Sequence, residues 1–198
     1  MEALWAPFLV YAVVTTFTPG PNNITSSAIG MRRGYRRTIP YIGGITLGFL
    51  VIMLASGLLT DLASKAYRGI LPWFKWIGVA YMTWLAVSLF LPSRHGAGED
   101  TERNVGFTSG LLLQIMNPKV ILYGITIYSS FHLLISDTPA RLVGSSVLLA
   151  LMGCVSTSLW ALLGSLFSRL LRGRVARLCF NGVMALLLVL SAVSLALH

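Results

Sequence analysis

The stretch FTPGPNN at residues 17–23 decides how this chain folds, because it interrupts a long run of apolar residues. Proline lacks the backbone N–H that a helix interior uses, and glycine favours torsion angles outside the helical region. The apolar run around this stretch extends from about residue 4 to residue 28, enough to cross a membrane as a helix. The sequence therefore predicts a first transmembrane helix that is broken near its middle.

A second break has the same character. Asn117-Pro118-Lys119 interrupts the apolar run from about residue 107 to residue 134, and Gln114 lies just before it. Pro19 and Pro118 occupy nearly the same position in the two halves of the 198-residue chain, each in the first apolar run of its half. Paired breaks of this kind are typical of transporters that build their binding site from discontinuous helices.

Composition places most of the remaining chain in lipid. Hydrophobic residues make up 56% of the chain and charged residues only 11%, against about 25% charged residues in soluble domains. Mean hydropathy is +0.78. Six apolar runs approach the length that crosses a bilayer, at about 4–28, 39–59, 73–91, 107–134, 142–167 and 178–197. The predicted fold is an all-α polytopic membrane protein with six transmembrane helices, of which the first and fourth are broken.

The predicted spans divide into two similar halves of three. Because three is odd, the second half would cross the membrane in the opposite sense to the first, which gives a 3+3 inverted repeat. We expect residues 1–95 to form the first three-helix repeat and residues 105–198 the second. Residues 92–104 are then a linking cytoplasmic loop.

Basic residues between the spans predict the orientation. One set falls in alternate loops and consists of Arg32, Arg33, Arg36, Arg37, Arg94, Arg103, Arg169, Arg172, Arg174 and Arg177. The loops on the other side hold Lys65, Arg68 and Arg141. Because cytoplasmic loops are enriched in lysine and arginine, both termini are predicted to be periplasmic. The net charge of +9 is therefore interpreted as a topology signal, and no nucleic-acid partner is expected.

Few other features indicate chemistry. The N-terminal segment lacks the positively charged start of a signal peptide, so we expect none to be cleaved. Cys154 and Cys179 lack the spacing of a redox pair or metal site and are expected to pack as small apolar residues. No acidic residue lies deep in a span, the full set being Glu2, Asp61, Glu99, Asp100, Glu102 and Asp137. We therefore predict no metal and no cofactor.

The two breaks form the predicted binding site. A half-helix that starts at a break presents free amides and a positive dipole end, which favour a carboxylate. Lys119, the only charge deep inside a predicted span, has the same preference, whereas asparagine side chains and freed carbonyls favour an ammonium group. A small zwitterion such as an amino acid suits both. The predicted substrate-binding residues are Thr18, Pro19, Gly20, Pro21, Asn22, Asn23, Gln114, Asn117, Pro118 and Lys119.

Two structural alternatives remain open for these residues. The breaks could be plain proline kinks, and Lys119 could extend its ammonium group to an interface. Tyr123 could line the cavity or hydrogen-bond between helices. Gly44 and Gly48 permit close helix contact, either within the chain or in a homodimer.

The chain resembles a known family at these residues. The motif at residues 17–23, followed by Arg33-Gly34-Tyr35 and by Asn117-Pro118-Lys119, is similar to that of the LysE/RhtB family of bacterial amino-acid exporters. The resemblance covers essentially the whole chain, and residues 119–124 and 148–153 look closest to the cysteine/O-acetylserine exporter branch. It implies export of small amino acids from the cytoplasm across the bacterial inner membrane, driven by the proton gradient.

Competing function classes need features that this sequence lacks. A membrane-embedded enzyme needs a nucleophile with a nearby base, but no histidine lies inside a predicted span, so we predict no enzyme activity. A membrane-embedded enzyme and a transporter of another small solute are the two alternatives to an amino-acid exporter. Lys119 is the candidate proton carrier, because no carboxylate lies at depth; the hypothesis is that it alternates between binding the substrate carboxylate and releasing a proton.

Overall fold

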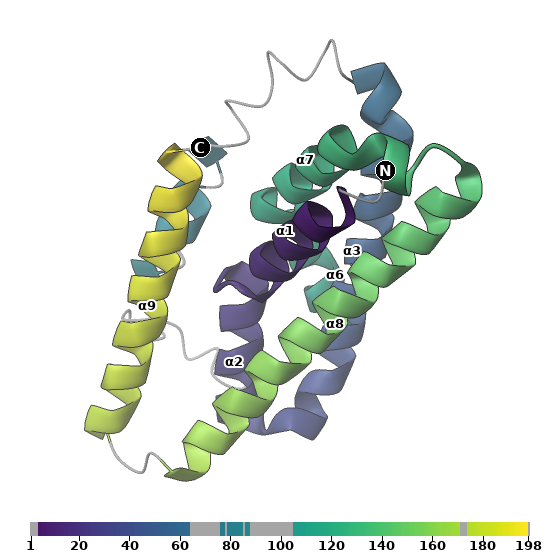
Figure 1. Ribbon diagram of the computed structural model, residues 1–198. Coiled ribbons are helices and arrows are strands. Elements are labelled where there is room, and N and C mark those ends of the chain that lie inside the picture. The colour runs from purple at the N-terminus through teal and green to yellow at the C-terminus, as the bar shows by residue number, and fades with distance from the viewer. Residues whose placement is uncertain are drawn as a thin grey trace.

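The computed structural model describes residues 4–63, 76–77, 79–84, 86–87, 105–170 and 174–197, and all regular structure within them is helical (Figure 1). The helices are α1 (Trp5–Phe17), α2 (Pro21–Arg33), α3 (Tyr35–Ala63), α6 (Phe107–Ile115), α7 (Pro118–Ile135), α8 (Pro139–Leu170) and α9 (Arg174–Leu197). This confirms the all-α prediction for the described residues. The predicted linking loop at 92–104 lies outside them.

Both predicted helix breaks are present. The first separates α1 from α2, and Gly20 between them is extended, with φ −167° and ψ 179°. The second separates α6 from α7, and Asn117 is likewise outside the helical region, with φ −81° and ψ 104°. Pro21 and Pro118 each stand at the first position of the following helix, where the missing N–H has no intrahelical partner to lose.

The turn between α2 and α3 explains the glycine of the Arg33-Gly34-Tyr35 motif. Gly34 has φ +78°, the left-handed region that a side chain disfavours, and its N–H donates to the Gly30 carbonyl at 2.9 Å. The chain can therefore end α2 and begin α3 within one residue. This turn lies at the end of the bundle opposite to the start of α1 and the α7–α8 connection (Figure 1).

Three described helical segments are long and apolar enough to cross a membrane, namely Tyr35–Leu59, Pro118–Ile135 and Pro139–Ser168. The segments Trp5–Phe17 and Leu178–Val193 are apolar but shorter. Large apolar side chains point outward from the described helices, as at Leu58, Leu133 and Met116. Such faces suit lipid rather than water. The six-span count and the inverted repeat remain predictions.

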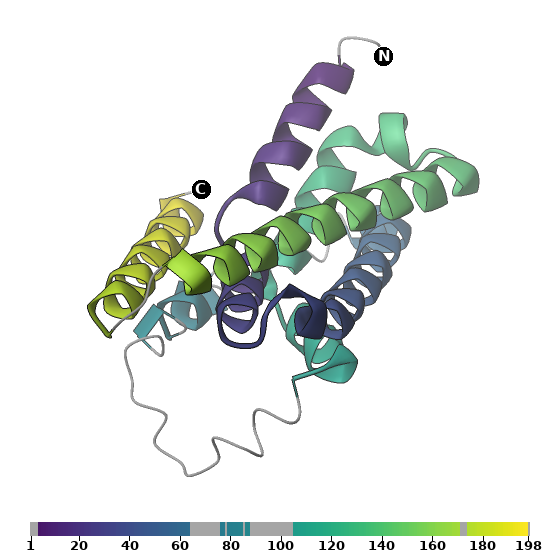
Figure 2. The same ribbon diagram turned by 90° about the horizontal axis from the view of Figure 1, so that it is seen from below.

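The two halves of the chain interlock. Helix α3 of the first half packs against α6 and α7 of the second half. Helix α8 of the second half packs against α1 and α2 of the first half (Figures 1 and 2). Helices α3 and α8 also pack against each other. Each half therefore covers the broken helix of the other, which brings the two breaks into the same region of the bundle.

Glycines allow the closest of these approaches. A Cβ on Gly44 of α3 would collide with the backbone carbonyl of Phe107 in α6, and a Cβ on Gly110 of α6 would collide with the carbonyl of Tyr41 in α3. Gly48 faces Gln114, whose Cβ and Cγ would lie 2.9 Å from an added Cβ. Gly44 and Gly48 thus serve contacts within this chain.

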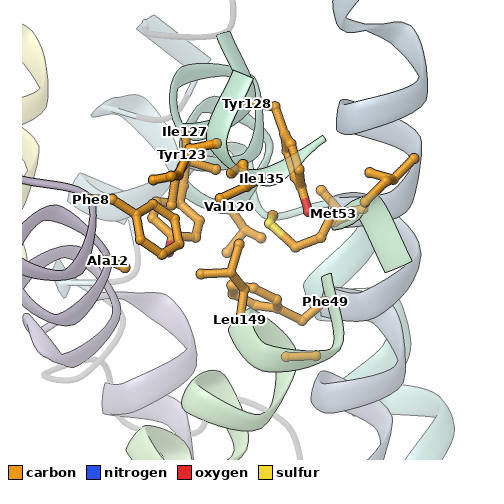
Figure 3. Close-up of a cluster of buried hydrophobic side chains, with 14 residues drawn as sticks. Phe8, Ala12, Phe49, Met53, Val120, Tyr123, Ile127, Tyr128, Ile135 and Leu149 are labelled. Carbon is orange, nitrogen blue, oxygen red and sulfur yellow. The ribbon is translucent and has the colours of Figure 1, made fainter. Parts of the chain in front are cut away.

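The largest buried cluster lies among α1, α3, α7 and α8 (Figure 3). It includes Phe8, Phe49, Tyr123, Tyr128 and Leu149, each at most 4% exposed. The rings and aliphatic chains in Figure 3 converge on a common centre. This apolar cluster adjoins the two breaks, since Phe49 and Tyr123 also contact the site described next.

Candidate functional site

The two helix breaks are joined directly by their side chains. Asn117 at the second break donates through Nδ2 to Oδ1 of Asn22 at the start of α2, at 2.8 Å. Lys119 Nζ donates to the Pro19 carbonyl of the first break, at 3.4 Å. The residues that the sequence placed in two separate motifs therefore form one site.

A chain of amides runs through this junction in a fixed direction. The backbone N–H of Lys119 donates to Asn117 Oδ1 at 3.1 Å, so the other end of that amide must be a donor. Asn117 then donates to Asn22, and Asn22 Nδ2 donates to Gln114 Oε1 at 2.5 Å. Gln114 is fully buried, and its Nε2 group has no hydrogen-bond partner among the described residues. The backbone N–H of Lys119 can only donate, and it therefore fixes the orientation of each amide in this chain of hydrogen bonds.

Carbonyls freed at the end of α1 are bound by side chains. Asn23 Nδ2 donates to the carbonyls of Thr16 and Thr18, at 3.1 and 2.9 Å. Ser156 of α8 donates to the Thr16 carbonyl at 2.9 Å and lies 3.2 Å from Asn23 Oδ1. Asn23 is only 4% exposed, so its amide replaces water as the partner of an irregular backbone.

A second residue of α8 and a residue of α9 also bind this break. Trp160 Nε1 of α8 donates to the Phe17 carbonyl at 3.3 Å, and Ser191 of α9 donates to the Pro19 carbonyl at 2.6 Å. The Pro19 oxygen is thus shared between Ser191 and Lys119. The break is a supported structure with bound carbonyls, not a simple kink.

A small cavity of about 40 Å³ opens beside this junction. It is lined by Thr15, Thr16, Thr18, Gly20, Pro21, Asn22, Asn23, Ile45, Phe49, Asn117, Lys119, Val120, Tyr123, Gly153 and Thr157. Amides, hydroxyls and the lysine form its polar lining, while Ile45, Phe49 and Val120 form an apolar lining. Ligand pockets usually measure about 300–1,000 Å³, so this conformation has room for water but not for an amino acid.

Lys119 has no acidic partner among the described residues, whose one ion pair joins Arg141 and Asp137. The lysine is half-buried at the cavity lining. Gly20 leaves room for it, because a Cβ there would lie 2.9 Å from Lys119 Nζ and 3.1 Å from its Cδ. The ammonium group therefore stays close to the first break and has donors left for an incoming anion.

The structure gathers the predicted site residues unequally. Seven of them line the cavity: Thr18, Gly20, Pro21, Asn22, Asn23, Asn117 and Lys119. Pro19 takes part through its carbonyl, Gln114 stands behind Asn22, and Pro118 is buried at the start of α7. Their role in binding a substrate stays a prediction.

Sequence reasoning did not select several residues of the cavity. These are Thr15, Thr16, Ile45, Phe49, Val120, Gly153 and Thr157. For Tyr123, lining the cavity is one of the two roles that the sequence leaves open. Helical spacing could have indicated Val120 and Tyr123, which follow Lys119 by one and four residues on α7. Residues from α3 and α8 carry no such local signal, because only the packing brings those helices to the breaks.

We expect Asn117→Ala to weaken both functions of this amide. The change leaves Lys119 N–H without its cap and removes the donor to Asn22, for a loss of about 0.5–2 kcal/mol from the cap alone. Asn117→Ser is the matched variant, because its hydroxyl oxygen can keep the cap acceptor without burying a charge, while it lacks the amide N–H that binds Asn22. Thermal unfolding in detergent should place the Ser variant above the Ala variant and below the wild type. Equal stability of wild type and Ala would contradict this role.

Comparison with known proteins finds relatives over nearly the whole chain. The sequence model of the family described as "LysE type translocator" matches residues 13–198. A "Cysteine/O-acetylserine efflux protein" of Klebsiella pneumoniae is 38% identical over 197 residues, covering 98% of both chains. Proteins of the same description from Salmonella typhimurium and Escherichia coli are 38% and 36% identical, over 96% of both chains. No solved structure matches this chain.

Proposed function

This chain belongs to the LysE type translocator family, and from that premise we propose that it is a secondary active exporter of small amino acids. Its substrates are cysteine and O-acetylserine, as the names of its relatives suggest, with homoserine and threonine as the next candidates. The protein moves them out of the cytoplasm across the bacterial inner membrane by proton antiport. Its action is transport, without an enzymatic step.

The observation that carries this proposal is the position of Lys119. Its ammonium group lines a small polar cavity where two helix breaks meet, and no acidic side chain neutralises it among the described residues. A charged group held in such a place is costly, and a function accounts for its presence. An α-carboxylate is the complementary group on an amino acid, and a charged hydrogen bond of this kind contributes about 1.5–3 kcal/mol.

The ammonium end of the substrate can use the acceptors of the first break. The carbonyls of Thr16, Thr18 and Pro19 are held in this conformation by side-chain donors. A substrate that enters would replace some of these donors, above all Lys119 at Pro19, whose 3.4 Å separation is long for a hydrogen bond. Binding of the carboxylate would draw the lysine away and free one acceptor position of the Pro19 carbonyl, which Ser191 also binds.

The small volume of the cavity supports an alternating-access cycle. At about 40 Å³ it must enlarge before an amino acid can bind. The side-chain bridge from Asn22 to Gln114 and Asn117 joins the two halves of the chain, so enlargement requires this bridge to loosen. In the proposed 3+3 inverted repeat, the halves rock about this point, with both termini in the periplasm.

Transport into everted membrane vesicles tests the proposal. Vesicles that contain the protein should accumulate O-acetylserine when respiration energises them, and a protonophore should abolish accumulation. Cells that overproduce the protein should also resist inhibitory concentrations of cysteine and homoserine. Accumulation that survives the protonophore would exclude proton antiport, and failure to accumulate or protect against any small amino acid would exclude the exporter.

A further inference from the structure

A second cavity lies at the end of the bundle where α1 begins and α7 gives way to α8. Its volume is about 340 Å³, far larger than that of the cavity at Lys119 and within the range of ligand sites. It is lined by Trp5, Phe8, Leu134, Ile135, Arg141, Gly144, Ser145 and Leu148. This end of the bundle lies opposite to the arginine-bearing turn between α2 and α3 (Figure 1).

Arg141 gives this cavity the chemistry to bind a carboxylate. Its Nη1 donates to Asp137 Oδ2 at 2.7 Å and to the Leu133 carbonyl at 3.4 Å. The remaining guanidinium N–H groups have no partner among the described residues, and the side chain is 46% exposed. Arginine presents its donors as a planar fork that matches a carboxylate. Asp137 does not line the cavity and holds the Arg141 guanidinium from beside it.

A continuous column of aromatic rings joins the two cavities. We define this aromatic column as Trp5, Phe8, Phe131, Tyr11, Tyr123 and Phe49, in spatial order. Successive ring centroids lie 5.9, 5.5, 6.5, 5.8 and 5.9 Å apart. Trp5 and Phe8 line the second cavity, whereas Tyr123 and Phe49 line the cavity at Lys119. Figure 3 shows Phe8, Tyr123 and Phe49 together in the apolar cluster.

One member of the column stands at an irregular point of its helix. Phe131 has φ −123° and ψ 22°, which interrupts the helical torsions of α7 four residues before its end. Its ring contacts Phe8 and Tyr11 of α1. A change of angle at this kink would separate rings of α7 from rings of α1, and kinks are places where helix segments can change their angle.

We propose that the second cavity is an exit site for the exported amino acid, where Arg141 binds its carboxylate, and that the aromatic column is the closed barrier between it and the cavity at Lys119. This inference rests on the proposed function. The larger site lies at the predicted periplasmic end, Arg141 in its lining complements a carboxylate, and the column connects the two cavities ring by ring. A substrate released from Lys119 would pass between the separated rings of the aromatic column. It would then bind at Arg141 before it leaves the protein.

Substituted-cysteine labelling tests the exit site. Gly144→Cys is placed in a Cys154→Ser, Cys179→Ser background, because Gly144 lines the second cavity and a Cβ there meets nothing within 4 Å. A membrane-impermeant thiol reagent is added outside intact spheroplasts, with and without O-acetylserine, which has no thiol. Ala140→Cys is the matched control, because Ala140 is exposed in the first turn of α8 and does not line the cavity.

We expect O-acetylserine to slow labelling of Gly144→Cys and to leave labelling of Ala140→Cys unchanged. Arg141→Gln should raise the half-protecting concentration by about tenfold or more, and Arg141→Lys by less, because a charged hydrogen bond is lost only in the first. If O-acetylserine protected Gly144→Cys equally well in the presence and absence of Arg141, the exit site would be overturned. The same holds if O-acetylserine gave no protection in a protein that exports it. Protection that follows anionic lipid content would assign the cavity to a phosphate headgroup and would also overturn it.

A second arm examines the barrier. Val120→Cys lies in the cavity at Lys119 and should label slowly from outside, because the aromatic column intervenes. Phe131→Ala should accelerate that labelling severalfold, and an unchanged rate would overturn the barrier. Export by the cysteine-free background, measured in everted vesicles, reports on the proposed function separately. If export is absent while Gly144→Cys is still protected, the proposed function fails but the amino-acid site at Arg141 stands.

Discussion

Lys119→Met is expected to abolish gradient-driven export while the protein still folds and reaches the membrane. Methionine is of similar length and apolar, so it removes the charge without leaving a large void, and no described acidic residue loses a partner. Loss of one charged hydrogen bond of about 1.5–3 kcal/mol corresponds to roughly 10- to 100-fold weaker substrate binding. Accumulation of O-acetylserine in everted vesicles measures the loss.

Lys119→Arg separates binding of the carboxylate from transfer of the proton. Arginine keeps a positive charge for the substrate but does not release a proton in proteins. We expect it to retain part of the exchange of labelled for unlabelled substrate, which needs no gradient, and to lose uphill accumulation. Arg32→Gln is the control, because it removes an exposed cation at the end of α2. Full gradient-driven export by Lys119→Met would exclude Lys119 as both ligand and proton carrier.

Gly44→Ala is expected to cause the largest loss of stability among the small substitutions. The added methyl group would collide with the Phe107 carbonyl, and a backbone carbonyl held in a helix cannot turn aside. Helices α3 and α6 must then move apart, for a cost of about 1–3 kcal/mol. Thermal unfolding in detergent should show a midpoint several degrees lower.

Gly182→Ala in α9 is the control for this change. A Cβ there meets nothing within 4 Å, and alanine favours a helix more than glycine does, so stability should hold or rise slightly. Export should fall in the Gly44 variant as well, because α6 carries Gln114, which binds Asn22 at 2.5 Å. If the unfolding midpoints of the two variants matched, the close approach of α3 and α6 would not be a source of stability.

Local sequence was sufficient to predict the helix breaks and the residues around them. Proline disfavours a helix interior, and the clustered Pro19, Gly20 and Pro21 and the Asn117-Pro118 pair each end one helix and begin the next, whereas the single Pro40 lies inside α3. The two helices that follow begin at Pro21 and Pro118, because proline is well suited to the first helical position. Gly34 likewise marks the end of α2.

The partners of the break could not be predicted in the same way. Any donor within reach can satisfy a freed carbonyl, and the chain offers many serines and threonines. Only the packing of α8 and α9 selects Ser156 for Thr16 and Ser191 for Pro19. The sequence also leaves open whether Gly44 allows a contact within the chain or between two copies of it. Only the tertiary structure shows that Gly44 contacts α6 of the same chain.

The sequence alone thus determined that two apolar helices break at paired proline and asparagine motifs, because backbone chemistry acts within a few residues. The tertiary structure decided that the breaks meet, that Asn22 binds both Gln114 and Asn117, and that Lys119 reaches Pro19. It also decided which apolar and hydroxyl side chains complete the cavity. These contacts join residues about a hundred positions apart, and their geometry depends on helix packing, which no local pattern encodes.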